Sequence, residues 1–352
     1  MALISFARST ETASFFSPLL GMAHTEQPIE VRRDPLTGAT AVASAELATK
    51  EAMFYGSTDW DYAEQLARNA REGCFFCPEK VLEVTPKYPD EIVPGGRLEH
   101  GRALVFPNLF PLAALHAVVT YPKRHFLRPS DFAPGMLHEG LGAAVEFARL
   151  AEGAVPGLEH LEVCCNNMLP AGASMVHPHF QVFGGAGAPW LIRLQWERAA
   201  AFRAAHGVSY WRALADEEQE RGERVIGSRA GWTWLAPFAP TGGREVVGLL
   251  PGVVRVAELT DALVSEAAFG LSHVLAWYER EGLSAFNFTL SGGPLGGAAD
   301  THAVQLHVVA RTAFRQDYRT DDYFLQKQLG GELIFVTPEQ IAETLRPEFA
   351  TG

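Results

Sequence analysis

The sequence predicts an α+β protein in which one strand–helix–strand unit occurs twice. A chain of 352 residues is long for a single core and favours two subdomains or a duplicated fold. Segment 136–153 repeats apolar residues at helical spacing and lies between extended segments. The same order recurs after Gly231, where 234–251 parallels 104–122 and a second helix is expected at 260–280. We therefore divide the chain into a tail at 1–27, a first unit at 28–190, a helical connector at 191–230 and a second unit at 231–352.

Composition limits the classes of partner. Apolar residues make up 47% of the chain and charged residues 20%, which is ordinary for a soluble globular protein. With 41 acidic and 29 basic residues the net charge is −12, which argues against a general binder of nucleic acid or of anionic membranes. No apolar run approaches the ~20 residues of a membrane span. A phosphorylated small substrate stays compatible with this charge, because its site needs only a few local cations or backbone amides.

The N-terminus and the cysteines indicate the compartment. Residues 1–24 lack the basic start and long apolar core of a signal peptide, so we expect a disordered or loosely docked tail. Four cysteines, two of them in the C-x-x-C of Cys74 and Cys77, fit a reducing, cytoplasmic setting and a metal better than disulfides. Two thiolates at this spacing can chelate one tetrahedral ion, but a reduced thiol pair packed in a loop would have the same sequence. Cys164 and Cys165 lie in an apolar segment and are expected to be buried thiols.

The first unit is expected to begin with a turn and a strand at 31–44. Two strands joined by a loop follow at 102–120, then the helix at 136–153 and a strand at 161–167. The loop after this strand contains Gly172, where the backbone could approach a phosphate closely.

The stretch 172–183, G-A-S-M-V-H-P-H-F-Q-V-F, is the one around which we take the chain to be organised. His177, His179 and Gln181 stand at alternate positions, with apolar residues between them. In a strand the side-chain period is two, so the three polar groups share one face. Two imidazoles and an amide on one face suggest a site that binds phosphate or metal, or that attacks phosphorus. Neutral imidazole is a competent nucleophile, since its unperturbed pKa is ~6.5.

The remaining chain is expected to repeat this plan in a degenerate form. Segment 190–229 is charge-laced and is predicted to be a solvated helical connector. In the second unit a strand at 286–290 and a Gly-rich loop at 291–297 match the strand and loop of the first, and 305–309 occupies the place of the H-P-H-F-Q run. A last strand at 331–336 precedes a helix that Thr337, Pro338 and Gln340 cap.

The run from Asn166 through Ser174 to Gln181 resembles the active-site segment of galactose-1-phosphate uridylyltransferases. These form the nucleotidyltransferase branch of the histidine triad superfamily, whose hydrolase branch has a third His where Gln181 stands. Val176 replaces a proline of the usual Ser-x-Pro-His-Pro-His-x-Gln. The resemblance implies duplicated histidine-triad-like units with an antiparallel sheet (a half-barrel) flanked by helices. It also implies transfer from a nucleoside diphosphate sugar through a covalent nucleotidyl-histidine, in a ping-pong reaction of the hexose-1-phosphate uridylyltransferase type.

The resemblance also implies roles for individual residues. His179 is the nucleophile, and Gln181 and Ser174 donate hydrogen bonds to the phosphoryl oxygens. Zinc is implied as the metal, with a closed shell of Cys74, Cys77, His125 and His177, where His177 either binds the metal or supports His179. The substrate-binding residues implied are Arg32, Asn108, Phe110, Asn166, Gly172 and Glu332. An alternative interpretation of Arg32 is a solvated surface arginine without a substrate role.

Three departures from the family pattern limit what it implies. Leu109 stands where the family has Asp, so the base is not predicted. Gln305 replaces a histidine of the second, iron-type site of some relatives, and we predict no such site. In the C-terminal sugar-contacting segment Gly331 replaces an aromatic residue, so galactose is not predicted as the acceptor sugar.

The expected substrates are a nucleotide sugar and a sugar phosphate or inorganic phosphate. No nucleic acid and no membrane is expected as a partner. A second copy of the chain is expected, in a homodimer. An alternative reaction is phosphorolysis of nucleotide sugars or dinucleoside polyphosphates, with inorganic phosphate as acceptor. A third reading is a zinc-stabilised nucleotide-binding protein without turnover.

Overall fold

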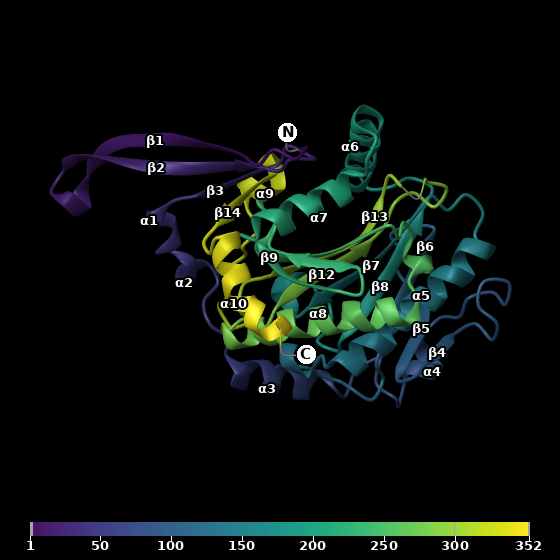
Figure 1. Ribbon diagram of the computed structural model, residues 1–352. Helices are drawn as coiled ribbons and strands as arrows, with labels where there is room; N and C mark the ends of the chain where they lie inside the picture. Colours follow the sequence, from purple (N-terminus) through teal and green to yellow (C-terminus); the bar gives the residue numbers. More distant parts are fainter. Residues whose placement is uncertain (1–2, 299, 351–352) are drawn as a thin grey trace.

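A ten-stranded antiparallel sheet forms the centre of the computed structural model, which describes residues 3–298 and 300–350 (Figure 1). In spatial order its strands are β4 (Leu98–His100), β5 (Ala103–Pro107), β6 (Leu115–Thr120), β8 (His179–Gly185), β7 (His160–Asn167), β12 (Phe286–Ser291), β13 (Ala303–Ala310), β11 (Gly243–Pro251), β10 (Trp232–Leu235) and β9 (Val225–Arg229). Each neighbouring pair is antiparallel. The predicted α+β class with a large antiparallel sheet is confirmed.

The strand order of this sheet has a mirrored form. From one edge the order is β4, β5, β6, β8 and β7. From the other edge it is β9, β10, β11, β13 and β12, and the two halves meet where β7 pairs with β12. β4 and β9 remain as edges, so the sheet is open. An internal duplication would produce this order, while the predicted unit boundaries at residues 190 and 230 stay predictions.

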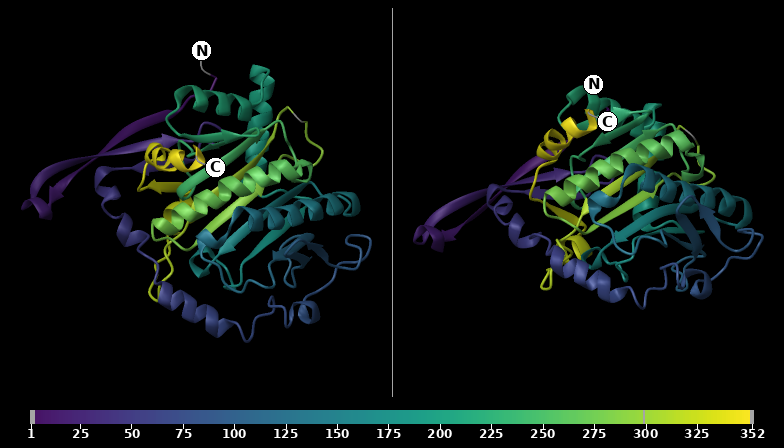
Figure 2. Two further views of the ribbon diagram at one scale, coloured as in Figure 1. Left: turned by 60° about the horizontal axis from the view of Figure 1, so that its bottom comes forward. Right: turned by 90° about the horizontal axis from the view of Figure 1, so that it is seen from below.

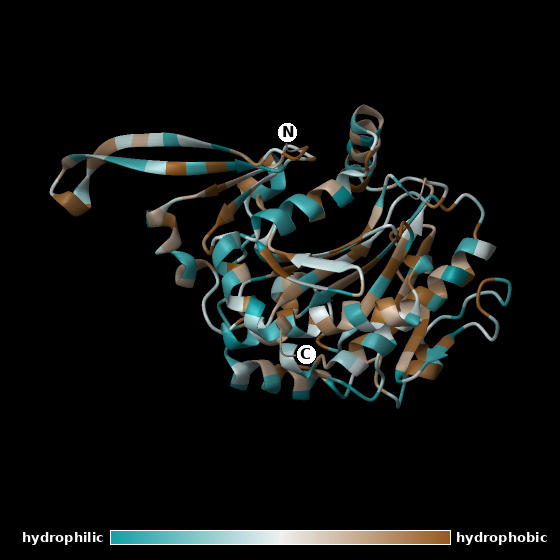
Figure 3. Ribbon diagram, in the orientation of Figure 1, coloured by the Kyte–Doolittle hydropathy of each residue, from teal (hydrophilic) through white to brown (hydrophobic). Residues whose placement is uncertain are grey.

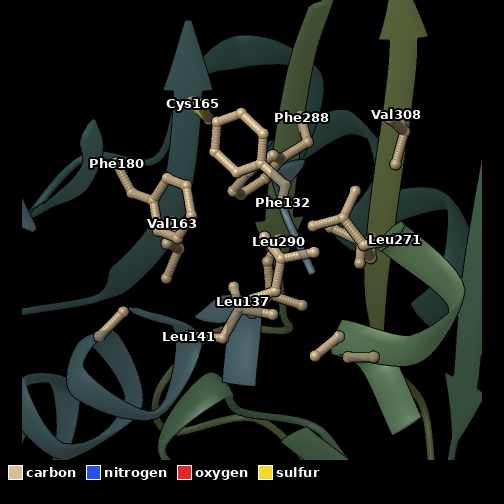
Figure 4. Packing of buried hydrophobic residues seen from close by; sticks show 14 of the residues in the cluster. Phe132, Leu137, Leu141, Val163, Cys165, Phe180, Leu271, Phe288, Leu290 and Val308 are labelled. Carbon is tan, nitrogen blue, oxygen red and sulfur yellow. The ribbon is translucent and has the colours of Figure 1, made fainter. Parts of the chain in front are cut away.

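Helices α5 (Pro134–Ala154) and α8 (Asp261–Arg280) pack against each other across one face of the sheet (Figure 2). Both are predicted by the sequence to within two residues at either end. The main core lies between these helices and the sheet, where Phe180 and Phe288 belong to one apolar cluster with Leu271 (Figure 4). The expected alternation along β8 is confirmed, because its apolar positions face this core.

Two glycines allow the helices to approach the sheet closely. A Cβ on Gly140 of α5 would lie 1.9 Å from the hydroxyl of Tyr121, and one on Gly270 of α8 would lie 2.1 Å from the indole of Trp234. Tyr121 is consequently wedged between α5 and the sheet, where its hydroxyl donates to the carbonyl of Met136 at 2.8 Å. This contact fixes the backbone that follows β6, and that backbone takes part in the site described below.

On the opposite face of the sheet, the helices among the described residues cover its two ends. Helices α6 (Trp190–His206) and α7 (Tyr210–Arg221) pack over the second unit, where Trp211 shares a buried cluster with Leu249. The short helix α4 (Val81–Val84) packs over the first unit against Leu104, Phe106 and Val118. The middle of this face carries polar side chains.

The charged connector is helical as expected, but its last residues join the sheet. The acidic helix α7 is largely hydrophilic (Figure 3) and ends at Gly222, which adopts a left-handed backbone (φ 65°). The prediction of helix up to Arg229 is wrong, because Val225 and Ile226 begin the edge strand β9 beside β10. Branched side chains that pair with an existing strand favour extended backbone over another helical turn.

Most of the predicted tail forms strands, so disorder, one of the two alternatives expected for it, is wrong. Strands β1 (Ala7–Ser17) and β2 (Ala23–Arg33) form a long antiparallel hairpin around a short 3₁₀ turn (Pro18–Leu20), and it extends away from the body (Figure 1). The hairpin continues into a second sheet with β3 (Thr40–Ala43) and β14 (Gly331–Ile334). Most of its side chains are exposed, so their pattern lacks the hydrophobic alternation that marks a half-buried strand, and the sequence resembles a tail. Residues 1 and 2 of the predicted tail lie outside the described residues.

The remaining elements complete the surface. They are α1 (Ala45–Ala48), α2 (Glu51–Phe54), α3 (Trp60–Ala70), α9 (Phe324–Leu329), α10 (Pro338–Ala350) and the 3₁₀ turns Pro129–Asp131, Leu169–Ala171 and Val256–Glu258. The predicted capping box of α10 is confirmed, because Thr337 N–H donates to Gln340 Oε1 (2.9 Å) and Gln340 N–H donates to Thr337 Oγ1 (3.3 Å). Among the described residues no helix has the length and apolarity needed to cross a membrane.

Candidate active site

Four half-buried side chains form a polar strip across the middle of the sheet. Gln181 of β8, Cys164 of β7, Thr289 of β12 and His307 of β13 lie directly opposite one another in successive ladders. Their neighbours along each strand point to the helical face and are buried. The period-two alternation therefore brings residues from both units onto one accessible face.

His179 begins β8 beside one end of this strip, with 8% of its surface exposed. Its Nδ1 lies 2.9 Å from the carbonyl oxygen of His177. A carbonyl can only accept, so Nδ1 carries the proton and Nε2 keeps a free lone pair. Burial lowers the pKa of His179 below its usual value, although the bond to His177 opposes this. The ring is thus neutral near pH 7, with one nucleophilic nitrogen.

Phe76 is a neighbour of this ring that the sequence interpretation missed. Its ring lies edge-on to His179 with centroids 5.4 Å apart, and it also contacts His177 at 5.8 Å. The phenyl ring helps to desolvate both imidazoles. Its position between the cysteines of the C-x-x-C was the available signal, since a residue between two metal ligands stays close to the metal.

The structure brings the four predicted metal ligands together. Cys74, Cys77, His125 and His177 are all buried, and their ligand atoms lie within 4.8 Å of one another. Nδ1 of His177 is 3.3 Å from Sγ of Cys74, and Nδ1 of His125 is 3.2 Å from Sγ of Cys77. Two thiols and two imidazoles at this spacing could hold one ion tetrahedrally.

The outer contacts of the two histidines suit metal binding. Nε2 of His125 donates to the carbonyl of Ala67 (2.8 Å), and Nε2 of His177 donates to the carbonyl of Tyr121 (3.1 Å). Each ring therefore presents an unprotonated Nδ1 to the thiols, which is the usual arrangement of metal-ligating histidines. Burial lowers the pKa of His177 to about 4. His177 is therefore compatible with both of the roles left open by the sequence, because its ring lies in the cluster that could hold a metal and its carbonyl accepts from His179.

Gln181 contacts a histidine that the sequence analysis did not single out. Oε1 of Gln181 lies 2.8 Å from Nε2 of His116, a buried residue of β6. Asn108 lies next to it, with its amide nitrogen 3.3 Å from the same Nε2. Phe110 shares the loop with Asn108, but its side chain is 79% exposed. The one signal for His116 was a lone polar residue inside the apolar strand L-H-A-V-V-T.

Asn166 is oriented by a chain of residues from the second unit. Nδ2 of Asn287 donates to Oδ1 of Asn166 (2.7 Å) and to the carbonyl of Ala171 (2.9 Å). Arg311 in turn donates to Oδ1 of Asn287 (2.8 Å) and is held by both oxygens of Asp321. Neither Asn287 nor Arg311 stands in a local motif, so no sequence signal marks them.

This arrangement points the free amide of Asn166 towards the loop that precedes β8. A Cβ on Gly172 would lie 3.9 Å from Nδ2 of Asn166, and Gly172 has the left-handed φ of 86° that suits glycine. Met168 opens the same loop with φ 68°, which is strained for a residue with a side chain. Ser174 is exposed at the far end of the loop. Asn166 and Gly172 therefore lie side by side, as a phosphate-binding loop would require.

Two predicted substrate residues, Arg32 and Glu332, lie on the second sheet, in β2 and β14. Arg32 is buried, and its guanidinium donates to Glu30 (2.6 Å) and Glu339 (2.9 Å). The interpretation of Arg32 as a solvated surface residue is wrong, because the side chain is buried and paired with two carboxylates. Glu332 of β14 accepts from Gln326 (2.8 Å), and burial raises its pKa to about 7. A substrate role for either residue stays a prediction.

Comparison with known proteins supports the α+β fold described above. No family model matches the chain. An uncharacterised protein of Archaeoglobus fulgidus is 30% identical over 345 residues, which cover 97% of this chain and 98% of that protein. Galactose-1-phosphate uridylyltransferase of Rattus norvegicus is 28% identical over 187 residues, and this match spans 50% of the chain and 48% of the rat enzyme.

A solved structure extends the likeness to most of the chain. The crystal structure of an ADP-glucose phosphorylase from Arabidopsis thaliana with bound ADP-glucose superposes with a TM-score of 0.68 at 18% identity. The superposition covers 90% of this chain and 98% of the plant protein. At this identity the likeness establishes a common fold.

Proposed function

This chain belongs to one family with the Archaeoglobus protein and is galactose-1-phosphate uridylyltransferase-like in fold, and from this premise we propose that it is a nucleotidyltransferase. Its donor is a nucleoside diphosphate sugar, and its acceptor is a sugar phosphate. The reaction passes through a nucleotidyl group carried on His179. The observation that carries the proposal is the bond from His179 Nδ1 to the His177 carbonyl, because it leaves Nε2 as the one nitrogen free to attack.

In the first step Nε2 of His179 attacks the α-phosphorus of the donor. A nitrogen–phosphorus bond forms, the bond from that phosphorus to the bridging oxygen breaks, and sugar 1-phosphate leaves with the bridging oxygen. The ring now carries a positive charge, which the His177 carbonyl at Nδ1 stabilises. In the second step a phosphate oxygen of the acceptor attacks the same phosphorus and releases the free imidazole.

Hydrogen-bond donors around the phosphorus stabilise the charge that develops on its oxygens. Gln181 lies two residues after His179, on the same face of β8. Asn166 and the backbone at Gly172 offer further donors, and Ser174 closes the loop. An amide at position 181 cannot activate water as an imidazole would, which favours transfer over hydrolysis.

We assign zinc to the cluster of Cys74, Cys77, His125 and His177. Four protein ligands complete a tetrahedral shell, so the ion would supply structural cross-linking and no open coordination position. Its contribution to the reaction is indirect. When bound, it would fix the backbone at His177, whose carbonyl accepts the hydrogen bond from His179 Nδ1.

Phosphorolysis, with inorganic phosphate as acceptor, is the second candidate. It is favoured by the C-terminal segment, where Gln326 donates to Glu332 and so occupies one of its oxygens. The fold is also that of an ADP-glucose phosphorylase. Donor cleavage and His179 chemistry are the same in both reactions, so the acceptor decides between them. The homodimer remains a prediction from the resemblance, and the cytoplasmic location remains a prediction from the cysteines and the N-terminal sequence.

The test is to trap the nucleotidyl group on the protein. Protein mixed with UDP-glucose or ADP-glucose is quenched and analysed by mass spectrometry, and the mass of the adduct names the nucleotide. We expect one adduct on His179 and none in His179→Ala, while the matched variant His307→Ala, at the other end of the polar strip, keeps it. A wild-type protein that forms no adduct but still binds nucleotide would contradict the proposed transfer and favour the hypothesis of a nucleotide-binding protein without turnover. Chasing the adduct with glucose 1-phosphate or with inorganic phosphate then identifies the acceptor.

A further inference from the structure

The side-chain amide of Gln181 has two ends, and only one of them suits a phosphoryl oxygen. Its nitrogen donates hydrogen bonds, whereas its oxygen only accepts and would repel a second oxygen. A glutamine free to turn would present the wrong end for part of the time. The orientation of this amide is therefore a property that catalysis needs and that some neighbour must supply.

The hydrogen bonds of His116 determine which of its nitrogens carries a proton. The backbone N–H of Leu112 points at Nδ1 from 3.0 Å, while Oε1 of Gln181 lies 2.8 Å from Nε2. A backbone N–H can only donate, so Nδ1 accepts and is unprotonated. The proton of the neutral ring is then on Nε2, and it is donated to Gln181. The amide nitrogen of Gln181 is left for another partner.

Asn108 does not compete for this proton. Its Oδ1 accepts from the backbone N–H of Phe110 (2.9 Å), which turns its Nδ2 towards His116. Nδ2 of Asn108 and the protonated Nε2 are both donors, and their separation of 3.3 Å exceeds the 2.8 Å to Gln181. The amide hydrogens of Asn108 therefore also remain available to a ligand.

The backbone holds the ring of His116 firmly in this place. The carbonyl of His116 accepts from the backbone N–H of Asn108 (2.8 Å) and from the hydroxyl of Tyr88 (3.1 Å). The residue is 5% exposed, and Phe183 packs edge-on against its ring. A buried donor in a fixed position selects one of the two amide orientations, because the other would place the NH₂ group against Nε2–H.

We propose that His116 is a positioning residue for nucleotidyl transfer, which holds the Gln181 amide with its NH₂ group towards the phosphoryl oxygens at His179. This inference rests on the function proposed above and adds a residue to it. His116 contacts no reacting atom. It acts through Gln181 and connects that amide to the loop of Asn108 and Leu112, where Asn108 is one of the residues that the resemblance implies in substrate binding.

Two variants separate the hydrogen bond from the shape of the ring. His116→Phe keeps a ring against Phe183 but removes both nitrogens, whereas His116→Gln restores an amide donor near the position of Nε2. The measurement is the single-turnover rate of adduct formation from UDP-glucose and ADP-glucose labelled at the α-phosphate. We expect His116→Phe to slow this rate by about tenfold to a hundredfold. Removing a hydrogen-bond donor that contacts the reacting oxygens directly typically slows a reaction by about a hundredfold to a thousandfold, and His116 acts only through such a donor. His116→Gln should recover most of it.

A double-mutant cycle distinguishes positioning from a general loss of structure. In a Gln181→Leu background, His116→Phe should cause no further slowing, because its target is already absent. Losses that multiply would overturn the inference, and so would a His116→Phe variant with the wild-type rate. A wild-type protein that forms no adduct would instead overturn the proposed function and this inference with it.

A readout independent of activity comes from the ring itself. In nitrogen-15 NMR of the wild-type protein, with His116→Phe used to assign the signals, the proton of His116 should reside on Nε2. A His116 ring protonated at Nδ1 would overturn the inference even if the adduct forms at the normal rate.

Discussion

Asn166 and Asn287 lie directly opposite each other on β7 and β12, and the side-chain nitrogen of Asn287 donates to the side-chain oxygen of Asn166 at 2.7 Å. These strands are the pair at which the two halves of the sheet meet. Arg311 donates to the oxygen of Asn287 and so fixes its amide in one orientation. The second unit thus orients a side chain that we place in the phosphate-binding loop of the first.

The variant Asn287→Asp tests this link. An aspartate still accepts from Arg311, but it has no NH₂ group for Asn166 or for the carbonyl of Ala171. We expect a free energy of unfolding lower by about 1–3 kcal/mol and weaker nucleotide binding, because buried acceptors lose their donor. Chemical denaturation and calorimetric titration with UDP and ADP measure the two effects.

Thr289→Val is the matched control for this variant. Thr289 lies two residues along β12 on the same face, and its hydroxyl contacts Sγ of Cys164 at 3.8 Å. We expect its nucleotide affinity to stay close to that of the wild type. Unchanged binding in Asn287→Asp would show that the orientation of Asn166 does not depend on Asn287.

Local patterns were sufficient to predict the strand that carries His179 and the direction in which its side chains point. The period of two along 177–182 places His179 and Gln181 on one face and Phe180 and Val182 in the core, and β8 has this arrangement. The spacing of Cys74 and Cys77 likewise indicated a metal. The other two candidate ligands came only from the resemblance, since His125 lies 48 residues from Cys77 and His177 lies 103 residues from Cys74.

Long-range partners could not be predicted from such patterns. His116 reaches Gln181 across 65 residues because β6 pairs with β8, and nothing in the sequence of either strand specifies that pairing. Asn287 reaches Asn166 across 121 residues for the same reason. The N-terminal hairpin was missed on different grounds, because its strands pair with each other while most of their side chains are solvent-exposed.

Loss of one thiol should abolish the metal site and loosen the His177 carbonyl, which accepts the hydrogen bond from His179. Cys74→Ser removes one of four buried ligands, so we expect one equivalent of bound metal in the wild type and little in the variant. The melting temperature should fall by several degrees, and adduct formation should slow because the carbonyl of His177 is less well fixed. Elemental analysis, calorimetry and the trapping assay measure these three quantities.

Cys164→Ser is the control for the thiol chemistry. Cys164 lies on the polar strip outside the metal cluster, so this variant should retain a full equivalent of metal and the wild-type melting temperature to within a few degrees. Equal metal contents in the two variants, or a wild-type protein whose stability does not respond to a chelator, would contradict the assigned cluster.

Glu332 should make stability depend on pH in an unusual direction for a carboxylate. Burial, together with the charges of Asp321 and Glu245, raises its pKa to about 7, despite hydrogen bonds from Leu333 and Gln326. The folded pKa lies above the unfolded value, so the folded state holds the proton more tightly. The stability that this group contributes is present below about pH 4.5 and is lost as pH rises through about 7. Glu332→Gln should therefore be more stable than wild type at pH 8 and nearly equal to it at pH 4.5. The gain at pH 8 should be roughly 1.4 kcal/mol for each pH unit that separates the folded pKa from the unfolded one.

Glu339 provides the opposite case in the same protein. Burial would raise its pKa, but its hydrogen bond and ion pair with Arg32 outweigh burial and lower it. Its stabilising contribution is therefore present above the unfolded pKa and is lost as pH falls through the lowered one. Glu339→Gln should cost stability at pH 8, where Glu332→Gln gains it. Denaturation curves at pH 5, 6.5 and 8 compare the two variants, and parallel pH profiles would show that the environment of Glu332 does not disfavour its charge.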